Sequence, residues 1–130
     1  NNTPSTPAIS LLYALKQKVD SIAEEGLEAR FARHAKLNAM IHTWMAKHGF
    51  ENFAPPGFQS KSLTAIDNTS GRLDVPAFIK TLRAKHNVLI NGGYGKIKGA
   101  TFRISNMGNE TEETMQKLID QLDDVIPSFL

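Results

Sequence analysis

The sequence predicts an α+β domain in which a small, mainly antiparallel sheet of about three to four strands is covered by helices on one face. Two patterns support this fold class. Apolar residues recur at helical spacing in long segments near both ends of the chain, and short strand-like segments lie between them. The 130 residues of the chain are enough for one domain of ordinary size.

Residues 1–9 are predicted to form an irregular lead-in, because Pro4 and Pro7 interrupt a polar stretch. Residues 10–130 then form the folded domain. A long N-terminal helix begins at Ser10. Its apolar stripe consists of Leu11, Leu15, Val19 and Ile22.

A second helical pattern runs from Leu27 to His48 and ends before Gly49. Gly26 separates the two patterns. Either Gly26 ends the first helix, or the two segments form one long helix that bends at this glycine. The pattern alone leaves both alternatives open.

The middle of the chain predicts short strands around one helix. Residues 62–66 and 88–90 are strand-like, and between them Asp74 is a plausible N-cap of a helix that Asn87 closes. A third strand is predicted at 101–105. The elements therefore alternate in a way that suits an antiparallel sheet.

The last helix is predicted to start with a capping box made by Asn109 and Glu112, and to end at Pro127. Six acidic residues and one basic residue lie between Glu110 and Leu130. This acidic helix leaves open an alternative function for the chain, a non-catalytic protein-interaction domain that binds a basic partner.

Composition excludes several functional classes. The chain has no cysteine, which removes disulfides and Cys-ligated metal and fits a cytoplasmic location. The four histidines lack a metal-binding spacing, so no metal is expected. A net charge of +2 gives little support for nucleic-acid binding. No apolar run is long enough to span a membrane.

Arg103 is the main candidate for ligand binding. Side chains alternate along a strand, so Arg103 points away from the core if Phe102 and Ile104 pack under the helices. A guanidinium is a planar fork of donors that matches a carboxylate. From its position alone, however, Arg103 is equally consistent with an ordinary surface arginine.

A glycine-rich segment precedes this strand. Gly92, Gly93 and Gly95 flank Tyr94 and permit close backbone approach, as in a tight hairpin or a ligand-binding loop. The segment matches neither the spacing of a P-loop nor that of a dinucleotide-binding fingerprint.

Taken together, residues 92–95 (Gly-Gly-Tyr-Gly) and 102–108 (Phe-Arg-Ile-Ser-Asn-Met-Gly) resemble the C-terminal signature of class V aminotransferases. This branch of fold-type I pyridoxal-phosphate enzymes includes alanine–glyoxylate and serine–pyruvate aminotransferases. Residues 3–15 and 24–34 resemble, in the same order, the segments of the family's long interdomain helix. The sequence departs from the family at Ser105, where glycine is common.

The resemblance implies that Arg103 grips the substrate α-carboxylate and that residues 92–95 lie near the mouth of the active site. It also implies that Thr3 contacts the phosphate of pyridoxal 5′-phosphate in the neighbouring subunit of a homodimer. Ser5 or Thr6 would take that place after a small shift in alignment.

The same resemblance implies that the Schiff-base lysine lies in a large domain ahead of this chain, since Lys96 and Lys98 match no cofactor lysine. The chain alone is therefore expected to be inactive. The whole enzyme would transfer an amino group between an amino acid and a 2-oxo acid, of the serine or alanine and glyoxylate or pyruvate type. A cysteine desulfurase of the same class is disfavoured by the absence of cysteine.

Overall fold

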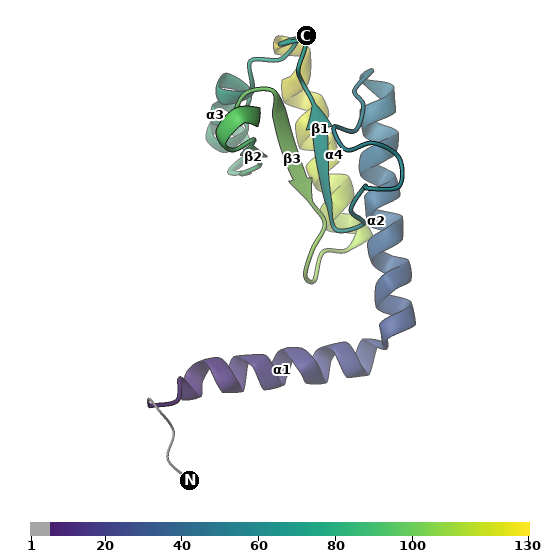
Figure 1. Ribbon diagram of the computed structural model, residues 1–130, viewed down its shortest axis with the longest axis vertical. Coiled ribbons are helices and arrows are strands. Elements are labelled where there is room, and N and C mark those ends of the chain that lie inside the picture. The colour runs from purple at the N-terminus through teal and green to yellow at the C-terminus, as the bar shows by residue number, and fades with distance from the viewer. Residues whose placement is uncertain (1–5) are drawn as a thin grey trace. The chain divides into compact units, whose positions relative to one another are not determined.

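The computed structural model describes residues 6–130 and has the predicted α+β architecture. The chain divides into two compact units, Asn1–Ala32 and Arg33–Leu130. Two 3₁₀ turns, Gly95–Ile97 and Ile126–Ser128, accompany the regular elements. These elements are α1 (Ile9–Glu25), α2 (Leu27–Lys47), β1 (Leu63–Asp67), α3 (Val75–His86), β2 (Asn91–Gly92), β3 (Thr101–Ser105) and α4 (Glu112–Val125) (Figure 1).

Gly26 ends α1, so the first two helical patterns form separate helices. Its φ of 81° lies in the left-handed region, which glycine adopts without the steric cost that a Cβ would add. The amide of Gly26 still donates to the carbonyl of Ile22 at 2.9 Å and so closes the last turn of α1. No residue of α1 is buried, and Leu11 and Leu15 are among its exposed apolar side chains.

The sheet has three strands in the order β1-β3-β2, and both pairings are antiparallel. The prediction of a strand at 88–90 was wrong, because pairing begins only at Asn91 and Gly92. Ile90 is buried in the core all the same, at 5% exposure. An apolar run reports burial, and here burial is achieved without backbone pairing to β3.

The helices pack on one face of the sheet. Figure 1 shows α4 behind β1 and β3 and α3 beside β2. The sheet contributes Ile66, Phe102 and Ile104 to the core. The main helical contributors from the second unit are Leu37, Ile41, Trp44, Met45, Phe78, Leu82, Met115, Leu122 and Val125.

Two of the predicted helix caps differ in outcome. Asp74 caps α3 as predicted, since its Oδ1 accepts from the amide of Ala77 at 3.1 Å. The capping box of α4 was placed two residues too early. Thr111 and Thr114 form it, with the amide of Thr114 donating to the Thr111 hydroxyl at 3.2 Å and the amide of Thr111 donating back at 2.9 Å. Threonine hydroxyls can satisfy free amides at a helix start as well as Asn and Glu do.

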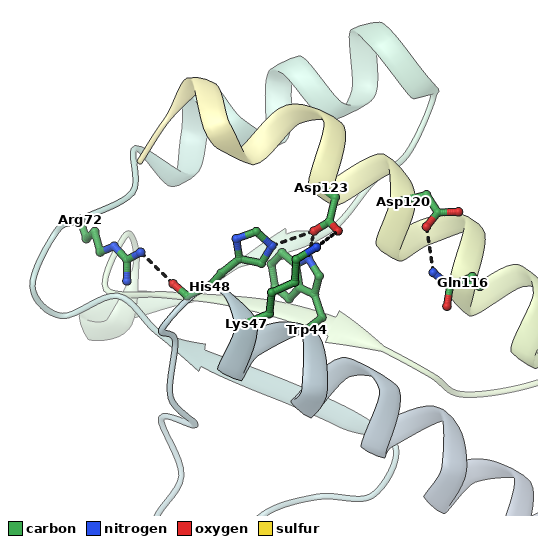
Figure 2. A network of polar contacts seen from close by, with 7 residues as sticks. All are labelled: Trp44, Lys47, His48, Arg72, Gln116, Asp120 and Asp123. Atoms are coloured by element: carbon green, nitrogen blue, oxygen red, sulfur yellow. Dashed lines mark hydrogen bonds and ion pairs between the residues drawn. The ribbon is translucent and has the colours of Figure 1, made fainter.

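Asp123 joins the end of α2 to α4 (Figure 2). Its carboxylate accepts hydrogen bonds from Trp44 Nε1 at 2.7 Å and Lys47 Nζ at 2.5 Å, and His48 Nε2 lies 2.7 Å away. Burial raises the pKa of Asp123, but these hydrogen bonds lower it more, so the net pKa lies below the ordinary value of 3.8. The folded state therefore favours the ionised carboxylate.

We expect Asp123→Asn to lower the stability of the chain at pH 7 by about 1–3 kcal/mol, because hydrogen bonds to a charged acceptor are lost. A carboxyl group whose folded pKa is depressed stabilises the fold above its unfolded pKa, and this contribution is lost as the pH falls through the folded value. The difference between variant and wild type should therefore narrow below about pH 3.8. Thermal unfolding as a function of pH measures it.

Asp120→Asn is the matched control, because Asp120 lies on the same helix and accepts only from Gln116 at 2.8 Å among the described side chains (Figure 2). An exposed substitution of this kind changes stability by about 0.5 kcal/mol or less. Equal losses in the two variants, or a loss at Asp123 that does not vary with pH, would contradict the assignment.

Candidate functional site

Arg103 lies on the face of the sheet that the helices leave uncovered. Its neighbours in the chain, Phe102 and Ile104, are 0% and 1% exposed and point into the core. Arg103 therefore points to the opposite face, opposite Ala65 of β1 and Asn91 of β2. This is the orientation that strand alternation predicted.

The polar atoms of Arg103 are without partners inside the described part of the chain. Nε is buried and has no hydrogen-bond partner there. An unsatisfied buried donor costs about 1–3 kcal/mol, so folded proteins seldom keep one without a reason. An anionic ligand that accepts hydrogen bonds from the guanidinium would remove this cost.

The guanidinium of Arg103 stacks on an aromatic ring instead. Its Cζ atom lies 4.5 Å from the centroid of the Tyr94 ring. Tyr94 itself is 72% exposed. The sequence placed Tyr94 in a loop near the site but gave no sign of this contact, which depends on the path of the turn between β2 and β3.

The glycine-rich segment forms a tight connection between β2 and β3. Gly92 pairs with Phe102, and the amide of Gly93 donates to the carbonyl of Thr101 at 3.0 Å. A Cβ on Gly93 would lie 2.1 Å from the carbonyl oxygen of Ile97, so only glycine fits there. Gly95 begins the 3₁₀ turn that follows. The segment thus brings Tyr94 to Arg103.

A hollow of about 660 Å³ borders the same strand. Arg103 and Ser105 line it from β3, and Leu89 and Asn91 line it from the segment that leads into β2. Lys117 and Gln121 of α4 complete the wall. Its volume is in the range of small-molecule sites, and it opens where β3 lacks a paired neighbour beyond Asn91.

The described residues do not fit the covalent attachment of pyridoxal phosphate. Such an attachment uses a lysine that reacts as a neutral amine, which burial or a nearby cation favours. All lysines between residues 6 and 130 are exposed, including Lys96, Lys98 and Lys117, which are the ones near the Arg103 strand. Thr3, the candidate for a phosphate contact, lies outside the described residues.

Other candidate sites find little support in the described chain. No group of three or more His, Asp or Glu side chains between residues 6 and 130 could hold a metal ion. Burial lowers the pKa of His42, with a further contribution from Lys61, and no carboxylate is printed beside it to make it a general base. Over residues 6–130, no helix combines the length and apolar character needed to cross a bilayer.

The acidic last helix is largely engaged within the domain. Glu112 pairs with Lys36 at 2.6 Å, and Asp124 pairs with Lys85 at 2.7 Å. Asp123 is held by the end of α2, as described above. These contacts leave fewer carboxylates available for a basic partner and weigh against the alternative of an interaction domain.

The chain is similar to aminotransferases in sequence. It is 34% identical over 106 residues to an uncharacterized aminotransferase of Methanocaldococcus jannaschii, a match that covers 82% of this chain and 27% of that protein. It is 33% identical over 110 residues to a serine–glyoxylate aminotransferase of Arabidopsis thaliana, with 84% and 27% covered. No protein-family model matches the chain.

The fold points the same way. The structure of an alanine–glyoxylate aminotransferase from Nostoc sp. superposes with a TM-score of 0.86 at 28% identity, over 96% of this chain and 33% of that one. This chain therefore spans about a quarter to a third of the length of its relatives. In sequence order it corresponds to their last part. The chain belongs to the class V aminotransferase family, as its C-terminal small domain.

Proposed function

We propose that this domain supplies the arginine that binds the substrate carboxylate in a pyridoxal-phosphate-dependent aminotransferase. The observation that carries the proposal is the state of Arg103: it lies on the open face of the sheet, and its buried Nε lacks a hydrogen-bond partner within residues 6–130. A substrate α-carboxylate would accept two parallel hydrogen bonds from the guanidinium and satisfy these donors.

The acceptor substrate we propose is a small 2-oxo acid, with glyoxylate as the first choice. The names of several relatives combine glyoxylate with serine, alanine or aspartate, so the amino donor varies among them and the acceptor does not. An oxo acid of this size has little besides its carboxylate for a protein to hold, which makes the arginine decisive for its binding.

The cofactor would act as the electron sink for amino transfer. The exposed lysines of the described chain indicate that a preceding large domain holds it. We further propose that the whole enzyme is a homodimer in which Thr3 contacts the cofactor phosphate. The cytoplasmic location expected from the absence of cysteine stays a prediction.

The test is an assay of the whole enzyme that contains this domain. We expect the purified enzyme to absorb visible light through bound pyridoxal phosphate, to be bleached by borohydride, and to convert glyoxylate to glycine with an amino donor such as L-serine or L-alanine. The 130-residue chain alone should show neither property. A colourless whole protein without transamination would contradict the proposal.

A further inference from the structure

We propose that Tyr94 is a positioning residue that holds the guanidinium of Arg103 ready for the substrate carboxylate. This inference rests on the proposed role of Arg103 and goes beyond it, because it assigns a function to a side chain of the glycine-rich loop. The contact that carries it is the 4.5 Å separation between Cζ of Arg103 and the centroid of the Tyr94 ring.

An aromatic ring is suited to this task because it contacts the face of the guanidinium. The N–H donors point outward in the plane of the group, so a stacked ring leaves them free for a carboxylate. An aspartate or glutamate would also hold the arginine, but it would occupy the donors that the substrate needs. Inside the described chain, Arg103 makes no hydrogen bond or ion pair that would compete in this way.

The turn that carries Tyr94 is fixed at several points. Gly93 closes on Thr101 through the 3.0 Å hydrogen bond and packs against the carbonyl of Ile97 too closely for any side chain. Asn68, which is 3% exposed, reaches over from the end of β1. Its amide donates to the carbonyl of Ala100 and its Nδ2 to that of Gly99, both at 2.9 Å. The ring is therefore delivered to Arg103 by a pinned backbone.

The exposure of Tyr94 supports a role other than packing. At 72% exposure the ring contributes little to the hydrophobic core. Its hydroxyl makes no hydrogen bond with another described residue. The arginine contact is thus the interaction that accounts for where the ring lies.

The experiment uses the whole enzyme loaded with pyridoxal phosphate, with glyoxylate as the probe acceptor and L-serine as the donor. We expect Tyr94→Leu to raise the KM for glyoxylate about three- to tenfold, the range that a partly exposed cation–π contact supports. The carboxylate is held in both ground state and transition state, so kcat should change much less. Tyr94→Phe keeps the ring face and should restore the wild-type KM.

Phe58→Leu is the control for removing an exposed aromatic ring, since Phe58 is 82% exposed and lies in the loop that precedes β1. This variant should leave KM and kcat unchanged. A double-mutant cycle completes the test: in the Arg103→Lys background, Tyr94→Leu should have little further effect, because the two residues act as one unit.

The arms separate the two proposals. If Arg103→Lys leaves the KM for glyoxylate unchanged, the proposed function of Arg103 fails. If Arg103→Lys raises KM and Tyr94→Leu does not, the positioning role of Tyr94 alone is overturned. It is also overturned if Tyr94→Phe is as impaired as Tyr94→Leu, or if the effects of Tyr94 and Arg103 simply add.

Discussion

In the whole enzyme, Arg103→Lys lowers kcat/KM for glyoxylate by about 30-fold or more. Removing one partner from a desolvated charge pair costs about 2–5 kcal/mol, and a tenfold change in rate constant corresponds to about 1.4 kcal/mol. Lysine keeps the positive charge but offers a single ammonium in place of the planar fork, so the two parallel hydrogen bonds to a carboxylate are lost. Steady-state kinetics with varied glyoxylate measures the effect.

Arg72→Lys provides the matched control. Arg72 also stacks on an aromatic ring, with Cζ 5.0 Å from the centroid of Phe50. Its donors, however, are used by the carbonyls of His48 and Gly49, at 2.7 and 3.1 Å. Its replacement should change stability and leave the KM for glyoxylate as it is. Equal KM values for wild type and the Arg103 variant would show that another group binds the carboxylate.

The orientation of Arg103 could be predicted from the sequence because it depends on local geometry alone. Alternation along β3 fixes which side chains share a face, and the apolar character of Phe102 and Ile104 identifies the buried one. The contact with Tyr94 could not be predicted. It requires the path of the whole turn between β2 and β3, including a hydrogen bond from Asn68, which the sequence presented only as part of a turn signal.

The two local errors have a common physical origin. Val88-Leu89-Ile90 is apolar enough for a strand, yet pairing with β3 is set by the register of the hairpin and starts at Asn91. Asn109 and Glu112 have the spacing of a capping box, yet Thr111 and Thr114 lie closer to the first buried residue of α4, Met115, and form it. In both cases several residues satisfy the local rule, and the packing of the domain selects among them.

Phe102→Ala is expected to remove a large part of the stability of the domain. Phe102 is fully buried at the centre of the sheet and meets two other rings edge to face, Phe50 at 5.4 Å and Phe78 at 6.1 Å. Deleting a buried phenylalanine ring costs about 3–5 kcal/mol, and domains of ordinary size are stable by about 5–15 kcal/mol. The ring joins the loop after α2 to α3, so neither side can close the cavity without moving the other.

Urea unfolding of the chain, followed by fluorescence, measures this loss. The single tryptophan, Trp44, is 2% exposed and its ring is stacked on Phe50 at 6.1 Å, so it reports on the same core. Phe58→Ala, at an 82% exposed position, should shift stability by about 0.5 kcal/mol or less. A loss below about 1 kcal/mol in Phe102→Ala, well under the cost of a rigid cavity, would mean that the core collapses around the missing ring. In that case β3 would not be anchored from beneath, and the fixed orientation of Arg103 would need another cause.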